Sequence, residues 1–120
     1  MDSMNLPALL DGGWQQLSFG PFRAGVEICS LVSADDDTQP AVALLRYAPG
    51  ASVPAHRHTG METIVVLEGS QQDERGIYPA GSLVINHVGS VHSVQSPQGC
   101  VVLIQWDRPV EILNQPDSNS

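Results

Sequence analysis

Two histidines and a glutamate lie close together in the stretch "HRHTGME", residues 56–62, although the 120-residue chain has only four histidines. Alternate side chains of a strand share a face, so we expect His56 and His58 to point the same way. Gly60 allows the chain to turn before Glu62. Two imidazoles and a carboxylate at one point form a ligand set that divalent transition metals accept. The alternative is a pair of surface histidines near an acid.

The residues that follow the glutamate predict an apolar surrounding for such a site. Glu62, Ile64 and Val66 keep one parity along the run "ETIVVLEG", so they are expected to face the same side of a strand. Together with Val94 they are candidates for a dry barrel lining. Such a lining would exclude water and strengthen electrostatic interactions at the site.

A second segment, "GSLVINHVGSVHSVQS", places His92 at the start of another short strand. The spacing of glycine, histidine and glutamate in the two segments closely resembles the two conserved motifs of the cupin superfamily. The resemblance implies a small β-barrel with one metal ion inside. Carried over by position, the implied ligands are His56, His58, Glu62 and His92.

The second segment departs from the cupin pattern at two positions. His87 stands where the family usually has proline, and Ser96 stands where it usually has asparagine. Neither position is an implied ligand. His87 could be a fifth ligand or a proton shuttle, and the alternative is an ordinary histidine at the edge of a loop.

A closer resemblance covers roughly Phe22 to Trp106. The stretches "LLRYAPGASVPAHRHTGMETIVVLEG" and "GSVHSVQSPQGCVVLIQW" are similar to the cupin half of ChrR-type anti-sigma factors and to small acetylacetone-cleaving dioxygenases. In that group the first motif often ends Gly-Glu-Glu, whereas this chain has Met61-Glu62-Thr63. ChrR-type proteins hold the sigma factor through an N-terminal zinc-binding domain. We find no His-x3-Cys-x2-Cys cluster, so sequestration of a sigma factor by this chain alone is not expected.

Three hypotheses fit a centre of three histidines and one glutamate that holds one divalent ion of iron, zinc, manganese, nickel or cobalt. In the first, the chain binds or senses a small oxygen-containing molecule at the metal. In the second, it is an iron-dependent dioxygenase that acts on a β-diketone-like substrate. In the third, the metal only clamps two sheets together.

Other polar residues have weaker signals. Only one of Arg46 and Tyr47 can face the barrel interior by alternation. An inward Arg46 could pair with a substrate carboxylate or with Glu68, and the alternative is a surface side chain. Asp73 and Glu74 fall in a short hairpin between the motifs and are expected to be solvated.

The elements that must position these residues are short, extended and separated by turn residues. Runs rich in Val, Ile and Leu alternate with Gly, Pro, Asp and Ser, and no segment has a convincing helical period. We therefore predict an all-β, single-domain cupin, a double-stranded β-helix or jelly-roll barrel over residues 21–110. Residues 1–20 form a partly extended N-terminal segment, with one helical turn in "LPALLDGGW", and residues 111–120 form a flexible tail.

Composition limits the partners. The net charge of −8 with five Lys and Arg argues against nucleic acid and against anionic membranes. No apolar run approaches the roughly 20 residues that span a bilayer, and the start lacks the features of a signal peptide. We expect a cytoplasmic protein with a small-molecule ligand, in which Cys29 and Cys100 are buried free thiols. We also expect a homodimer, with the apolar "WQQLSF" as a candidate contact; the alternative is that Trp14 closes one end of its own barrel.

Overall fold

The computed structural model describes residues 3–113, and almost all regular structure in this range is β-strand. Ten strands form one antiparallel sheet, and two short 3-10 turns precede it. The predicted all-β single domain is therefore confirmed. The turns are η1 (Leu9–Asp11) and η2 (Gly13–Gln16); the strands are β1 (Gly20–Arg23), β2 (Val26–Val32), β3 (Ala41–Tyr47), β4 (Ala51–His58), β5 (Glu62–Asp73), β6 (Gly76–Pro79), β7 (Leu83–Asn86), β8 (Val91–Ser96), β9 (Cys100–Trp106) and β10 (Val110–Ile112).

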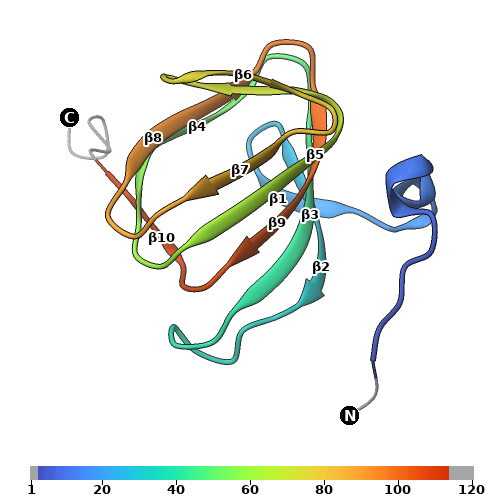
Figure 1. Cartoon of the computed structure of the whole chain (residues 1–120), viewed down its shortest axis with the longest axis horizontal. Helices are drawn as coiled ribbons and strands as arrows, with labels where there is room; N and C mark the ends of the chain where they lie inside the picture. Colours follow the sequence, from blue (N-terminus) through green and yellow to red (C-terminus); the bar gives the residue numbers. More distant parts are fainter. Residues whose placement is uncertain (1–2, 114–120) are drawn as a thin grey trace.

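The sheet curls so that its two halves face each other (Figure 1). The order of hydrogen-bonded neighbours is β1-β2-β3-β9-β5-β8-β4-β10, and β6 and β7 both pair with β5. β5 is the longest strand and belongs to both halves: its first residues pair with β7 and β9, and its last residues pair with β6 and β8. A register shift between Val66 and Glu68 marks the place where β5 bends.

The interior of the curled sheet is apolar. Alternate residues of β3, β5, β8 and β9 point inward and bury one continuous cluster, because strand side chains alternate between two faces. The predicted lining residues Ile64, Val66 and Val94 all belong to this cluster. The buried residues of the cluster are Val26, Ala43, Leu45, Tyr47, Ile64, Val66, Val94, Cys100, Val102 and Ile104.

A second apolar cluster covers the outer face of β3, β5 and β9. Trp14 of η2 is buried there against Leu44, Leu67 and Val101. The predicted helical turn near the start is present as η1 and η2, and "WQQLSF" begins in η2. Trp14 does not close the barrel end, because it packs on the outside of its own sheet. The homodimer itself stays a prediction.

The two cysteines lie on opposite faces of the sheet. Cys100 is buried in the interior cluster, whereas Cys29 packs half-buried against the outer one. Both are free thiols. The prediction of free thiols is confirmed, the prediction of burial holds for Cys100 only, and the sheet separates the two thiols.

The two ends of the barrel region differ from the sequence reading. The barrel was predicted to start at residue 21, and its first strand, β1, begins at Gly20 and pairs with β2. Val110–Ile112 forms β10 and pairs with β4, so residues 111 and 112 of the predicted tail are in a strand. The rest of that tail, residues 114–120, lies outside the described residues. Among residues 3–113 no helix is long and apolar enough to cross a membrane.

Candidate metal centre

The four predicted ligands come together inside the barrel. Each of His56, His58, Glu62 and His92 offers a ligand atom, and these atoms lie within 4.8 Å of one another. β4 supplies the first two histidines, β5 begins with the glutamate, and β8 places His92 directly opposite His56 in the antiparallel register. All four side chains are buried, so the alternative of a surface histidine pair is wrong.

Each histidine is held through its Nδ1 atom. His56 Nδ1 lies 2.9 Å from the Pro54 carbonyl oxygen, and His58 Nδ1 lies 3.0 Å from the Ser90 carbonyl oxygen. His92 Nδ1 lies 3.0 Å from the carboxylate oxygen Oδ2 of Asp73. A neutral imidazole that donates from Nδ1 has its lone pair on Nε2. The three rings therefore present Nε2 lone pairs to one another, with ring centroids 4.6–5.1 Å apart.

Two features of this arrangement fit a bound cation. His92 Nε2 is buried and has no hydrogen-bond partner. His58 Nε2 lies 3.1 Å from Glu62 Oε1, which puts a nitrogen lone pair against a carboxylate oxygen when the ring is neutral. Two adjacent ligands of one metal ion with bonds of about 2.1 Å are about 3.0 Å apart at a right angle. A metal ion would use the orphaned atom and remove the repulsion between the lone pairs.

The glutamate is fixed from a third strand. The side-chain amide of Asn86, at the end of β7, donates to Glu62 Oε1 over 2.9 Å. Burial raises the pKa of Glu62, whereas protons on the neighbouring histidines, on His58 first, lower it, and the net shift is downward. The charged form of Glu62 is the form that binds a metal ion.

Asp73 is the main correction to the sequence reading of this region. Its side chain is only 2% exposed, so the prediction that it is solvated is wrong. Besides His92 Nδ1 it accepts a hydrogen bond from the Tyr78 hydroxyl over 2.7 Å. Burial raises the pKa of Asp73, but the hydrogen bonds from Tyr78 and His92 overcome this and lower it. Glu74 is exposed, as predicted, and accepts hydrogen bonds from Ser93.

The other candidate residues lie away from the centre. His87 is exposed in the loop between β7 and β8 and is not part of the cluster, so it is a loop-edge histidine. Tyr47 is the inward member of its pair, and Arg46 points outward. Arg46 forms an ion pair of 2.7 Å with Glu27 and stacks on Phe19, so the alternative of a surface side chain is confirmed.

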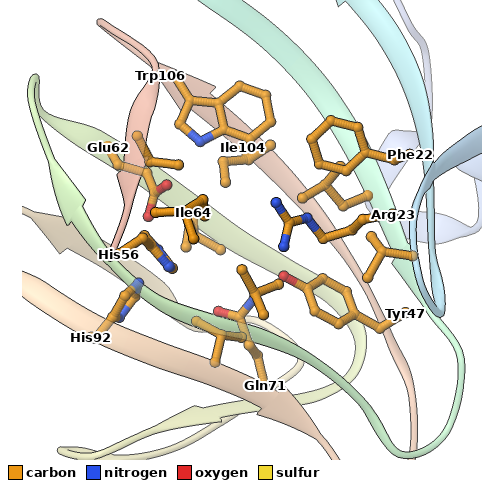
Figure 2. A pocket seen from close by; sticks show the side chains of 16 residues that line it. Phe22, Arg23, Tyr47, His56, Glu62, Ile64, Gln71, His92, Ile104 and Trp106 are labelled. Atoms are coloured by element: carbon orange, nitrogen blue, oxygen red, sulfur yellow. The ribbon is translucent and has the colours of Figure 1, made fainter. Parts of the chain in front are cut away.

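A small cavity of about 60 Å³ opens beside the cluster (Figure 2). His56, Glu62 and His92 face it, whereas His58 lies behind them. On the far side of the cavity the Tyr47 hydroxyl and the Arg23 guanidinium point inward (Figure 2). The remaining lining is largely apolar: Phe22, Val26, Leu45, Val53, Ile64, Gln71, Val94, Ile104, Trp106, Val110 and Ile112.

Three residues of the site were not predicted to take part in it. Asp73 and Asn86 orient ligands, and Arg23 faces the cavity. Asn86 ends the apolar run "LVI", and a polar residue in that place is at best a weak signal. Asp73 and Arg23 have no local signal, because each reaches the site only through the pairing of distant strands.

The curled antiparallel sheet and its inward cluster of three histidines and one glutamate define a small single-domain cupin. The chain belongs to the family of ChrR cupin-like domains, whose pattern matches residues 13–109. This confirms the resemblance expected from the two motifs.

Individual relatives agree with this assignment. The chain is 34% identical over 73 residues to the anti-sigma-E factor ChrR of Cereibacter sphaeroides, which covers 58% of this chain and 34% of ChrR. It therefore spans about a third of that relative. This chain is also similar to a chain of the crystal structure of Rhodobacter sphaeroides SigE in complex with the anti-sigma ChrR. The TM-score is 0.66 at 24% identity, and the match covers 77% of this chain and 49% of the chain in that structure. A putative acetylacetone dioxygenase from Methylibium petroleiphilum has a TM-score of 0.78 at 18% identity, over 98% of this chain and 84% of that one.

Proposed function

We propose that this chain is a metal-binding cupin that captures a small oxygen-containing molecule at one divalent transition-metal ion. The ligands of the ion are His56, His58, Glu62 and His92. The observation that carries the proposal is the buried, unpartnered Nε2 atom of His92, which points into a cluster where His58 and Glu62 also direct lone pairs at each other. An unpaired buried polar atom costs about 1–3 kcal/mol, and a shared cation removes that cost.

The donor set indicates what a bound ion would supply. Three neutral imidazoles and one carboxylate leave a divalent ion with a net charge of about +1. Six-coordinate Fe(II), Mn(II), Ni(II) or Co(II) would keep open positions for an oxygen donor, and zinc could take the same four ligands. The protein contributes fixed ligand geometry, through the three Nδ1 hydrogen bonds, and an apolar cavity wall that limits access of water.

Metal analysis of the natively purified protein tests the proposal. We expect close to one transition-metal ion per chain, and we expect His92→Ala to lose most of it while the barrel stays folded. His87→Ala is the matched control, because His87 is an exposed histidine of the neighbouring loop. A wild-type protein without metal, or a His92→Ala protein with wild-type metal affinity, would contradict the assignment.

A second candidate function is a dioxygenase that acts on a β-diketone-like substrate. The similarity to acetylacetone dioxygenases over most of the chain favours it. Tyr47 offers no base for such a reaction, because burial, and then the nearby Cys100 and Glu62, raise its pKa and keep its hydroxyl protonated. Oxygen uptake by the iron-loaded protein with acetylacetone would support this function; binding without oxygen uptake would support capture or sensing.

The similarity to ChrR adds a proposal about how ligand capture would affect a protein partner. ChrR is an anti-sigma factor, and its crystal structure contains SigE. In a sensing role, ligand capture in the cavity would change how this domain contacts a protein partner. A purely structural metal would need no cavity beside it, and the cavity that His56, Glu62 and His92 face therefore favours capture over a clamp.

A further inference from the structure

The arginines of this acidic chain are distributed unevenly. The sequence has five Lys and Arg in total, and all five are arginine. Arg46 and Arg57 form ion pairs with exposed carboxylates, and the exposed Arg75 pairs with the buried carboxylate of Asp73. Within residues 3–113, Arg23 and Arg108 pair with no carboxylate. Both line the same place, an outer pocket of about 280 Å³ next to the metal-site cavity.

The outer pocket adjoins the inner cavity. The two share five lining residues: Phe22, Arg23, Trp106, Val110 and Ile112. These residues come from the two end strands of the sheet, β1 and β10, and from the end of β9. Arg108 is exposed and lines the outer pocket alone, whereas Arg23 is half-buried and lines both.

Arg23 points into the cavity rather than to solvent. Figure 2 shows its guanidinium group between Trp106 and Tyr47, directed across the cavity toward the histidines and Glu62. Its stem lies along Phe22, with the guanidinium carbon 5.9 Å from the ring centre. Next to it, the buried Tyr47 hydroxyl and the buried Gln71 amide are polar groups in an otherwise apolar wall. This group of three faces the metal centre from the opposite side.

The charges of the cavity favour an anion. A divalent ion on three imidazoles and Glu62 has a net charge of about +1, and Arg23 adds a second positive charge across the cavity. Two positive centres without a nearby anion repel each other in a poorly solvated space. A guanidinium group also matches a carboxylate in shape, since it donates two parallel hydrogen bonds. In a protein of net charge −8, Arg23 and Arg108, which pair with no carboxylate within residues 3–113, would also guide anions inward.

We propose that the ligand is a small organic anion, an oxo acid, whose carboxylate is held by Arg23 while a second oxygen faces the centre formed by His56, Glu62 and His92. The Tyr47 hydroxyl is protonated and adds a hydrogen-bond donor on the same side. The inner cavity of about 60 Å³ restricts the ligand to a few non-hydrogen atoms. This inference rests on the proposed metal site and specifies which oxygen-containing molecules it takes.

Two probes of nearly equal size test the inference. Acetoacetate and acetylacetone have the same number of non-hydrogen atoms, and only acetoacetate has a carboxylate. We would titrate each into the metal-loaded protein by calorimetry, with wild type, Arg23→Met and Arg46→Met. Met keeps an apolar stem in place of the arginine stem. Arg46→Met is the matched control, since it removes the same charge from the outer face of β3.

We expect wild type to bind acetoacetate more tightly than acetylacetone. Arg23→Met should weaken acetoacetate about ten- to hundredfold, the loss expected for a hydrogen bond between charged groups, and should leave acetylacetone within about threefold. Arg46→Met should change neither. The inference is overturned if wild type does not prefer acetoacetate, or if Arg23→Met and Arg46→Met have equal effects.

Metal content separates this inference from the proposed function. Arg23 is not a ligand, so Arg23→Met should keep the wild-type amount of metal. Failure of the anion test with one metal ion per chain would overturn only the role of Arg23. A wild-type chain that holds no metal would overturn the proposed function, whatever the calorimetry shows.

Discussion

The three histidines of the centre have identical side chains but different supports. His56 and His58 donate to backbone carbonyls, whereas His92 donates to a buried carboxylate. A carboxylate partner makes an imidazole a stronger metal ligand than a carbonyl does, because it stabilises positive charge on the ring. His92 is also the histidine whose Nε2 has no other partner. Of the residues that hold the ligands in place, Asp73 is therefore the one on which metal affinity should depend most.

Replacing Asp73 with asparagine tests this dependence. The change keeps the size of the side chain and removes the charge that supports His92. We expect metal affinity to fall about 10–100-fold, with the fold retained. The measurement is competition for the metal by a chelator of known affinity.

Glu74→Gln is the matched control for that experiment. It removes the neighbouring carboxylate, which is exposed and contacts only the Ser93 region of β8. Its metal affinity should stay at the wild-type value. Equal losses in the two variants would mean that overall charge, rather than the contact with His92, sets the affinity.

The sequence predicted the cluster residues because their signal is local. His56, His58 and Glu62 lie within seven residues, and His92 stands in a second recognisable motif. Their supports could not be predicted in the same way. Asp73 reaches His92 only because the far end of β5 lies beside β8, and alternation alone could not decide which of Arg46 and Tyr47 points inward.

At the scale of elements, β5 is the strand on which the site depends most. It begins with Glu62 in one half of the sheet and ends with Asp73 in the other. The bend of β5 therefore sets the position of the ligand Glu62 relative to Asp73, which supports His92. Gly69 follows the bend with φ of +75°. A Cβ atom there would lie 2.2 Å from the Gly99 carbonyl oxygen, so only glycine fits.

We predict that Gly69→Ala is more destabilising than Gly50→Ala. Gly50 also has a positive φ, of +86°, but a Cβ there meets nothing within 4 Å. Gly50→Ala should therefore cost only the left-handed backbone conformation, about 1–2 kcal/mol. Gly69→Ala adds a backbone clash and should exceed that. Urea unfolding of both variants measures their free energies of unfolding. Equal losses would show that the backbone at Gly69 and Gly99 can move apart without cost.

The N-terminal turns form the second element with a testable role. Trp14 is buried on the outer face of the sheet, and its removal should leave a cavity there. We predict that Trp14→Ala lowers the free energy of unfolding by about 3–5 kcal/mol. Leu10→Ala is the control, since Leu10 belongs to the same segment but is 69% exposed.

Two further measurements separate this packing role from other roles. Because Trp14 contacts the outer cluster and not the cavity, the folded variant should bind metal as wild type does. Its elution on gel filtration should also equal that of wild type, since the indole packs against its own chain. A variant of wild-type stability that changes only its elution would place Trp14 in a contact between copies.

The errors at this scale share one cause. The runs that became β2, β3, β5, β7, β8 and β9 are rich in Val, Ile and Leu, and the sequence predicted them. β1 and β10 are short end strands that form because β2 and β4 offer them an edge. "WQQLSF" contains apolar residues because it covers the outer face of the sheet. A segment that covers a sheet in this way has no regular spacing of apolar residues from which its structure could be predicted. In each of these cases, contacts with residues distant in sequence determine the local structure.

At the scale of the whole molecule, the proposed metal centre and the core should be separate sources of stability. The interior cluster fills the barrel with aliphatic side chains from β3, β5, β8 and β9. The four cluster ligands occupy one end of β4, β5 and β8. A metal there would bind the folded chain in preference to the unfolded one, because folding brings His92 beside His56, His58 and Glu62. It would thus raise stability by mass action without being needed for folding.

Removal of the metal tests this separation. We expect protein stripped with EDTA to keep its far-ultraviolet circular dichroism, because the apolar core remains. Its melting temperature should fall by about 10 °C relative to protein in metal at a hundred times the dissociation constant, which corresponds to about 2.7 kcal/mol. Addition of metal to the stripped protein should restore the original value, whereas it should leave His92→Ala unchanged. Stripped protein that is unfolded would show that the core alone is insufficient, and that the centre is needed to form the barrel.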